Sequence, residues 1–244
     1  MPRKARKESS TGIYHVMLRG INQQNIFHDD EDNLKLIEIL VDCKKTDGFV
    51  LYGFCLMGNH IHLLIKAATS GDLGQIFKRI GVRYAYWYNS KYKRIGHLFQ
   101  DRYKSEPVET DEYFLSVLRY IHQNPVRAGI SISVASYAWS SYGEYIEGSK
   151  IVDTQLALDI LVLNDFADFH MIAEDISCLE DVPVRLSDDD AQKVIAETLG
   201  HGNIAQHLEN HERAEFLKAL KGKGLSIRQI SRLTGISKGF VEKA

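Results

Sequence analysis

The stretch around which this chain is organised is Met57-Gly58-Asn59-His60-Ile61-His62-Leu63-Leu64-Ile65. Its apolar and β-branched run predicts a strand over residues 60–66. Side chains alternate along a strand, so the two histidines project from one face while Ile61 projects from the other. Two neighbouring imidazoles on a rigid sheet form half of a divalent-metal site. An isolated His-x-His motif is also found as a pair of surface histidines on a half-buried strand, and the motif alone leaves both interpretations open.

The pattern on either side of this strand predicts an α+β domain over residues 1–148. We expect strands at 13–18 and 49–56, a hairpin turn at Gly58-Asn59, a helix at 32–46, a helix at 73–91 capped by Asp72, a strand ending near Val108, and a helix at 112–124 capped by Asp111 and stopped by Asn124-Pro125. The order β-α-β-β-α-β is the ferredoxin-like arrangement, in which an antiparallel sheet carries helices on one face.

Strand patterns fade after residue 148, and we expect a helical C-terminal domain over residues 149–244. Short helices are expected within 153–180, followed by helices at 188–199 and 204–220. Residues 225–244 then predict a short helix, a turn at Thr234-Gly235-Ile236, and a second helix capped by Ser237. This is a helix-turn-helix pattern, whose second helix would enter a DNA major groove. An ordinary helical hairpin is the alternative.

Composition and charge narrow the class of protein. No apolar run approaches the ~20 residues of a membrane helix, and no apolar signal core follows the basic N-terminus, so we expect neither a membrane span nor secretion. The cysteines Cys43, Cys55 and Cys178 have no paired spacing, which is typical of small buried side chains in a reducing compartment. Residues 1–130 hold 19 Lys and Arg against 14 Asp and Glu, and the remainder holds 11 against 18. This asymmetry indicates that the first half faces a polyanion.

The basic residues of the first half are interleaved with aromatic residues along the helix expected at 73–91. Cations meet phosphates and rings stack on unpaired bases, so this mixture suits a single nucleic-acid strand. The alternative is an amphipathic helix with a solvated charged face. The candidate DNA-binding residues are Arg79, Arg83, Lys93, Arg94, Arg102 and Lys104, with Arg228 and Lys238 in the C-terminal domain.

The helix expected at 112–124 supplies the groups that would complete a metal site. Tyr120 and Asn124 are four residues apart and so share a helix face. If that face packs beside His60 and His62, it would bring an amide oxygen to the metal and the phenol to the ligand that the metal binds. Nitrogen and oxygen donors without thiolate suit Mg²⁺ or Mn²⁺ acting on a phosphate. Tyr120 would then be a covalent nucleophile whose attack needs assistance, since a free phenol has a pKa of about 10. Alternatively, Tyr120 is one of the chain's twelve tyrosines that serves packing alone.

Three blocks in order resemble the single-tyrosine HUH transposases, in particular the branch of the REP-associated tyrosine transposases. The blocks are Met57-Gly58-Asn59-His60-Ile61-His62-Leu63-Leu64, Gly96-His97-Leu98-Phe99-Gln100-Asp101-Arg102-Tyr103-Lys104-Ser105 and Arg119-Tyr120-Ile121-His122-Gln123-Asn124-Pro125-Val126-Arg127-Ala128-Gly129. The likeness covers about residues 10–145. It implies an endonuclease that nicks single-stranded DNA near a hairpin, with Mg²⁺ or Mn²⁺, and forms a 5′-phosphotyrosine link while freeing a 3′-hydroxyl.

The resemblance assigns roles to individual residues and to the assembly. It matches His60 and His62 to the paired metal histidines, Tyr120 to the nucleophile and Asn124 to a third metal ligand. It also implies a homodimer in the cytoplasm of a bacterium, associated with the nucleoid. In such dimers the tyrosine helix serves either the histidines of its own chain or those of the partner, and the sequence leaves both arrangements open. Because the family does not need the C-terminal half, we expect that half to make a second DNA contact, for duplex recognition or regulation.

Two interpretations from other classes of protein stand beside the enzyme. One is a catalytically idle, domesticated transposase that regulates by binding duplex DNA through its helix-turn-helix. The other is an RNA-processing or RNA-binding protein on a ferredoxin-like sheet. A pure DNA-binding protein would need none of the four site residues, and the chain has no RNP signature, so the sequence favours the enzyme.

Overall fold

The computed structural model of this chain describes residues 6–67, 70–100, 102–161, 165–172, 188–199, 210–223, 225 and 227–243. The chain divides into two compact units, Met1–Leu179 and Glu180–Ala244. The boundary expected after residue 148 therefore falls within the first unit, because two later helices pack there against a helix that precedes it.

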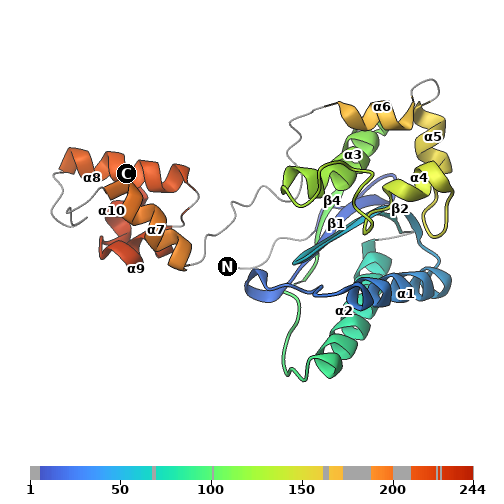
Figure 1. The fold of residues 1–244 in the computed structure, drawn as a ribbon, viewed down its shortest axis with the longest axis horizontal. Helices are drawn as coiled ribbons and strands as arrows, with labels where there is room; N and C mark the ends of the chain where they lie inside the picture. The colour runs from blue at the N-terminus through green and yellow to red at the C-terminus, as the bar shows by residue number, and fades with distance from the viewer. Residues whose placement is uncertain are drawn as a thin grey trace. The chain divides into compact units, whose positions relative to one another are not determined.

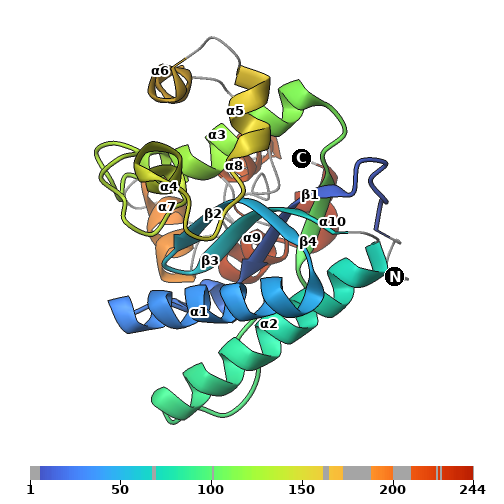
Figure 2. The ribbon, with the colours of Figure 1, turned by 90° about the vertical axis from the view of Figure 1, so that its right-hand side faces the viewer.

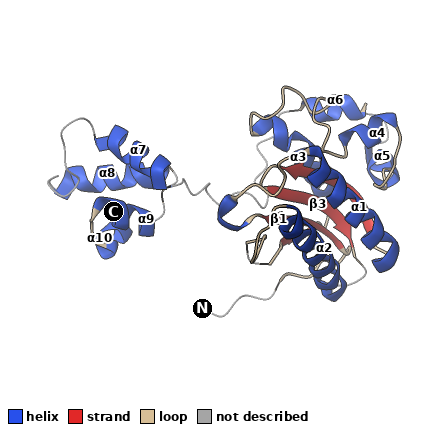
Figure 3. Cartoon of the chain, turned by 60° about the horizontal axis from the view of Figure 1, so that its bottom comes forward, coloured by secondary structure: helices blue, strands red, loops and turns tan. Residues whose placement is uncertain are grey.

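The first unit is built on a four-stranded antiparallel sheet (Figure 3). Its strands are β1 (Ile13–Arg19), β2 (Val50–Met57), β3 (His60–Lys66) and β4 (Lys104–Pro107). Their order in the sheet is β2-β3-β1-β4, and every neighbouring pair is antiparallel. This is the strand order of the ferredoxin-like arrangement, so the predicted α+β class is confirmed. The hairpin between β2 and β3 turns at Gly58-Asn59, as expected.

Helices α1 (Asp30–Asp47) and α2 (Ser70–Lys91) lie on one face of this sheet, as predicted for a ferredoxin-like core (Figures 1 and 2). A capping box begins α1: the Asp29 carboxylate accepts the backbone N–H of Asp32, and the Asp32 carboxylate accepts that of Asp29. Lys91, at the end of α2, lies 2.7 Å from Asp29 and 2.9 Å from Asp32. These ion pairs fasten the end of α2 to the start of α1.

The opposite face of the sheet, which carries the histidines, is covered by α3 (Asp111–Arg127) (Figure 2). Helices α4 (Tyr142–Glu147), α5 (Gln155–Leu161) and α6 (Phe166–Met171) lie on the same side of the sheet (Figures 1 and 2). Helix α3 packs closely against β2. A Cβ atom added at Gly53 would lie only 2.7 Å from Cδ1 of Leu118 on that helix. Glycine at this position of β2 thus allows α3, the helix that carries Tyr120, to pack directly on the sheet.

Three expected helix ends differ from the structure. The N-cap of α3 is Thr110, whose hydroxyl accepts the backbone N–H of Tyr113, and Asp111 is already helical. Asp72 likewise lies in the first turn of α2, where a carboxylate favours the positive end of the helix dipole. The third difference is Pro125, which does not stop α3. Proline removes one backbone hydrogen bond near the end, and the next turn still forms, with the N–H of Ala128 donating to Asn124 O at 3.0 Å.

The second unit is helical and has its own apolar core. Its helices are α7 (Asp188–Leu199), α8 (Asn210–Gly222), α9 (Ile227–Thr234) and α10 (Lys238–Lys243). The core comprises Ala191, Phe216, Leu217, Leu220, Leu225, Ile230, Ile236 and Val241. The part of the expected 204–220 helix before residue 210 lies outside the described residues. The two helices expected within 225–244 are present, joined at Gly235, which has a φ of +73°. Their identity as a DNA-binding helix-turn-helix stays a prediction.

Two further expectations concern single features. Cys43 and Cys55 are buried and reduced, as predicted, whereas Cys178 lies outside the described residues. Within the described part of the chain, no helix combines the length and apolar character that a membrane crossing requires.

Candidate active site

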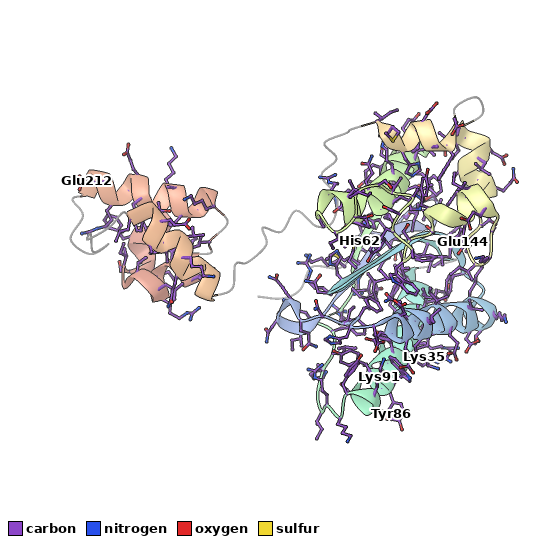
Figure 4. The ribbon with its side chains drawn as sticks, in the orientation of Figure 1. Lys35, His62, Tyr86, Lys91, Glu144 and Glu212 are labelled. Atoms are coloured by element: carbon purple, nitrogen blue, oxygen red, sulfur yellow. The ribbon has the colours of Figure 1, made fainter. Side chains whose placement is uncertain are left out.

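His60 and His62 project from the same face of β3, as the strand alternation predicts. Their ring centroids are 5.0 Å apart and the rings are nearly perpendicular, at 87°. His60 is 8% exposed and His62 is fully buried, so they are not a solvated surface pair. Figure 4 labels His62 on the α3 side of the sheet and Lys91 and Tyr86 on α2 at the other face.

Helix α3 brings both of its predicted site residues to these histidines. The Tyr120 ring meets His62 edge-on, with centroids 5.7 Å apart and an interplanar angle of 85°. The amide nitrogen Nδ2 of Asn124 lies 3.5 Å from Nε2 of His62. Tyr120 and Asn124 are each 4% exposed. The four residues predicted to form the site are therefore together, within one chain.

Asn59 holds the His60 ring in place, a role that the sequence pattern does not predict. Its amide oxygen lies 2.6 Å from Nδ1 of His60, while its amide nitrogen donates to the Gln23 carbonyl at 3.2 Å. Because the oxygen can only accept, Nδ1 of His60 carries the proton and Nε2 carries the lone pair. The signal in the sequence is the position of Asn59 directly before His60 in the hairpin turn.

His15, on β1, is a second site residue that the sequence pattern does not predict. Its Nε2 lies 2.9 Å from Nδ1 of His62, and the two rings stack with centroids 5.1 Å apart. The His15 ring also meets Tyr120 edge-on at 5.8 Å. The predicted strand at 13–18 included His15, but only the pairing of β1 with β3 places it beside His62.

Arg127, at the end of α3, brings a positive charge to the tyrosine. Its guanidinium carbon lies 5.2 Å from the centroid of the Tyr120 ring, within the range of a cation–π contact. Arg127 is exposed, so the charge stands at the solvent side of the buried phenol. An anion that approached Tyr120 from this side would meet it.

A chain of buried polar groups runs from the other side of α3. His122 contacts Nε2 of His170 through its Nδ1 and the hydroxyl of Ser141 through its Nε2, each at 2.8 Å. His170 donates from Nδ1 to the Phe166 carbonyl, also at 2.8 Å. Burial, together with the nearby His170, holds the pKa of His122 well below its usual value. Burial lowers the pKa of His170 to about 4, so both rings are neutral near pH 7.

The predicted DNA-binding residues fall into different surroundings. Arg79 forms an ion pair with Asp47 at 3.3 Å, and Arg83 forms one with Asp42 at 2.9 Å. Both carboxylates are on α1, so these ion pairs help to hold α2 against α1, on the face of the sheet opposite the histidines. Lys104 lies on the other side: it is opposite Met17 in the sheet, and Met17 is opposite His62, so all three share one face.

The remaining predicted residues lie away from this row. Lys93 is exposed in the loop after α2, and the guanidinium of Arg94 lies 5.6 Å from the Tyr88 ring. Arg102 is exposed just before β4. Lys238 forms an ion pair with Glu242 at 3.5 Å in the second unit. Arg228 lies in α9, but its side chain is outside the described part.

The donors at the site combine imidazole nitrogen with amide oxygen, a set that can bind a divalent cation. In the described part of the chain, no three His, Cys, Asp or Glu side chains are arranged to hold a metal ion. An amide oxygen can serve as a third donor, and Asn124 is already in contact with His62. Rotation of the Asn124 amide group by half a turn would direct its oxygen, in place of its nitrogen, toward the histidines. Two imidazoles and one amide oxygen fit Mg²⁺ or Mn²⁺ and leave positions open for a phosphate.

Comparison with known proteins agrees with this architecture. One similar structure is a REP-associated tyrosine transposase bound to a REP hairpin, with a TM-score of 0.52 and 14% identity, covering 73% of this chain and all of that one. At that identity the likeness establishes the fold. A second, a provisionally assigned transposase from Deinococcus radiodurans R1, has a TM-score of only 0.35 and 19% identity, and covers 50% of this chain and 95% of its own. No curated protein matches the sequence. Residues 8–124 match the family described as IS200-like transposases.

Proposed function

We propose that the chain is a metal-dependent, single-strand DNA endonuclease and strand transferase that acts at hairpin-associated sites through a 5′-phosphotyrosine on Tyr120. The observation that carries this proposal is the seating of Tyr120 and Asn124 on His62. A tyrosine that served packing alone would not need two histidine rings in contact with its own ring and an amide beside one of them. The match of residues 8–124 to the IS200-like transposases, and a structural relative bound to a REP hairpin, support DNA as the substrate.

The reaction is a balanced transesterification. The Tyr120 oxygen attacks the phosphorus of a phosphodiester and forms a P–O bond as the bond to the 3′-oxygen breaks. The phenol gives up its proton and the departing 3′-oxygen takes one up, so no other reactant is consumed. Attack of a 3′-hydroxyl on the phosphotyrosine reverses these steps and joins DNA ends, which makes the same site a strand transferase.

The groups around Tyr120 would bind the metal, the scissile phosphate and the DNA backbone. His60, His62 and Asn124 would hold Mg²⁺ or Mn²⁺, which when bound polarises the scissile phosphate and stabilises its developing charge. Arg127, exposed beside the phenol ring, would attract the same phosphate. Lys104, on the same sheet face at the edge strand, would bind the DNA backbone on either side.

We propose a second DNA contact for the helical unit, through α9 and α10. A duplex bound there would place a target next to the nuclease unit, while a homodimer would bring two nuclease units to two ends. The affinity for duplex DNA would be measured without metal. An affinity that is unchanged in Tyr120→Phe but lower in Lys238→Glu would support this contact. Duplex binding with no cleavage at all would instead favour the idle regulator.

A covalent-adduct assay tests the proposal. Protein is incubated with single-stranded oligonucleotides that carry hairpins from the flanks of its gene, with Mn²⁺ or EDTA, and separated on a denaturing gel. A 3′-end label should shift with the protein, whereas a 5′-end label should appear on a shortened strand with a free 3′-hydroxyl.

The matched control is Tyr86→Phe, which removes the same hydroxyl from an exposed tyrosine on α2. We expect the adduct to persist in Tyr86→Phe and to disappear in Tyr120→Phe and with EDTA. A metal-dependent adduct that Tyr120→Phe still forms would reject Tyr120 as the nucleophile.

A further inference from the structure

His15 is a buried imidazole in a strand whose neighbouring residues face an apolar core. Tyr14 and Val16 point to the face of the sheet that α1 and α2 cover, while His15 points to the α3 face with His62. A fully buried polar ring is costly unless it is hydrogen-bonded. The His15 contact with Nδ1 of His62, at 2.9 Å, supplies such a bond to both rings.

The direction of this hydrogen bond decides which nitrogen of His62 can bind a metal. A neutral imidazole has one N–H and one lone pair. If Nδ1 of His62 donates to His15, the lone pair is on Nε2, the nitrogen that faces Asn124. If His15 donates instead, the His62 proton sits on Nε2 and that nitrogen cannot be a ligand.

Two neighbouring contacts favour the first direction. The amide nitrogen of Asn124, a donor, lies 3.5 Å from Nε2 of His62 and so matches a lone pair there. His60 has the same arrangement, since Asn59 accepts its Nδ1 proton and leaves Nε2 with the lone pair. Each candidate ligand would then have a partner that accepts from Nδ1: Asn59 for His60 and His15 for His62.

We propose that His15 is the positioning residue of the metal site: it accepts the Nδ1 proton of His62 and so leaves the Nε2 lone pair of His62 directed toward Asn124. This inference rests on the proposed metal-dependent function. His15 itself neither binds the metal nor touches the DNA. Its hydrogen bond to His62 and its edge contact with Tyr120 fix the orientation of a ligand and of the nucleophile together. Partners of this kind usually contribute 10–100-fold to metal affinity.

The first test measures the tautomer of His62 in the metal-free, full-length protein. Nitrogen NMR of ¹⁵N-histidine-labelled protein, assigned with the His62→Gln variant, distinguishes a proton on Nδ1 from one on Nε2. We expect the Nδ1–H form. The Nε2–H form would overturn the inference even if the protein proved to be an active nuclease.

The second test compares two replacements of His15. The side-chain oxygen of His15→Gln reaches about as far as Nε2 and can still accept, whereas His15→Leu fills the space without an acceptor. We expect His15→Leu to weaken Mn²⁺ binding about 10–100-fold by calorimetry, and His15→Gln to stay within a few-fold of the natural protein. Equal binding in all three proteins, or equal loss in both variants when both are folded, would overturn the inference.

These outcomes can be separated from failure of the proposed function. If the natural protein bound no Mn²⁺ and formed no adduct, the metal-dependent function would fail. The His62 tautomer would still report whether His15 accepts its proton. Thermal unfolding of both variants shows whether either replacement has disrupted the fold.

Discussion

The buried pair of His122 and His170 predicts that the first unit loses stability in weak acid. Burial lowers the pKa of His170 from an ordinary value of 6.5 to about 4 and lowers that of His122 in the same direction. Below pH 6.5 the unfolded chain therefore binds a proton that the folded chain does not. Acid favours the state that binds more protons, so the stabilisation is complete above about pH 6.5 and is lost as the pH falls toward 4.

The size of the effect follows from the gap between the two pKa values of His170. At about 1.4 kcal/mol per pH unit, that gap corresponds to about 3 kcal/mol of unfolding free energy. Typical domains have only 5–15 kcal/mol in total, so the loss is a substantial fraction. His122 adds to it in the same direction.

Urea unfolding followed by tryptophan fluorescence measures this loss of stability in the first structural unit, residues 1–179. Both tryptophans, Trp87 and Trp139, lie in the first unit, so the signal is silent on the helical unit. Midpoints are compared between pH 7.5 and pH 4.5 for the natural protein and for His170→Gln, which can still accept from His122. We expect His170→Gln to lose less stability over this range.

An exposed histidine provides the control for this comparison. His97→Gln removes a histidine that is already solvated, so its pH dependence should equal that of the natural protein. If His170→Gln also kept the full pH dependence, the reasoning that burial depresses the pKa of His170 would be refuted.

Two further predictions concern how the site is assembled. Because Tyr120 meets His62 of its own chain, a mixture of Tyr120→Phe and His62→Ala proteins should form no adduct; recovery of the adduct would mean that the tyrosine serves a partner's histidines. Gly53→Ala should cost about 1–3 kcal/mol in urea unfolding, since its Cβ would lie 2.7 Å from Leu118 on the tyrosine helix. Gly143→Ala, where no atom lies within 4 Å of the added Cβ, should not destabilise, and an equal loss in both would reject the steric explanation.

The periodicity of the sequence was sufficient to predict the sheet and the main helices. Alternation placed both histidines on one face, and the four-residue spacing placed Tyr120 and Asn124 on one side of α3. Local chemistry predicted helix ends less well. Thr110 and Asp111 are both good caps, and Pro125 is tolerated because it removes a single hydrogen bond near the end of its helix.

What the sequence could not predict depends on contacts between distant segments. His15 lies 47 positions before His62, and only the pairing of β1 with β3 brings them together. Similarly, Arg79 and Arg83 looked like part of a DNA-binding face because their carboxylate partners are on another helix. Charge patterns reveal the sign of a surface, but not which neighbouring helix already neutralises it.

The most direct test of the central claim is to locate the DNA on the protein. The adduct is digested with trypsin and nuclease, and the peptide that keeps a nucleotide is sequenced by fragmentation in a mass spectrometer. Cleavage after Arg119 and Arg127 yields the peptide 120–127, in which Tyr120 is the sole tyrosine. We predict the nucleotide on Tyr120, attached through its 5′-phosphate. A nucleotide on the neighbouring peptide 105–119, which contains Tyr113, or on any other residue would contradict the account.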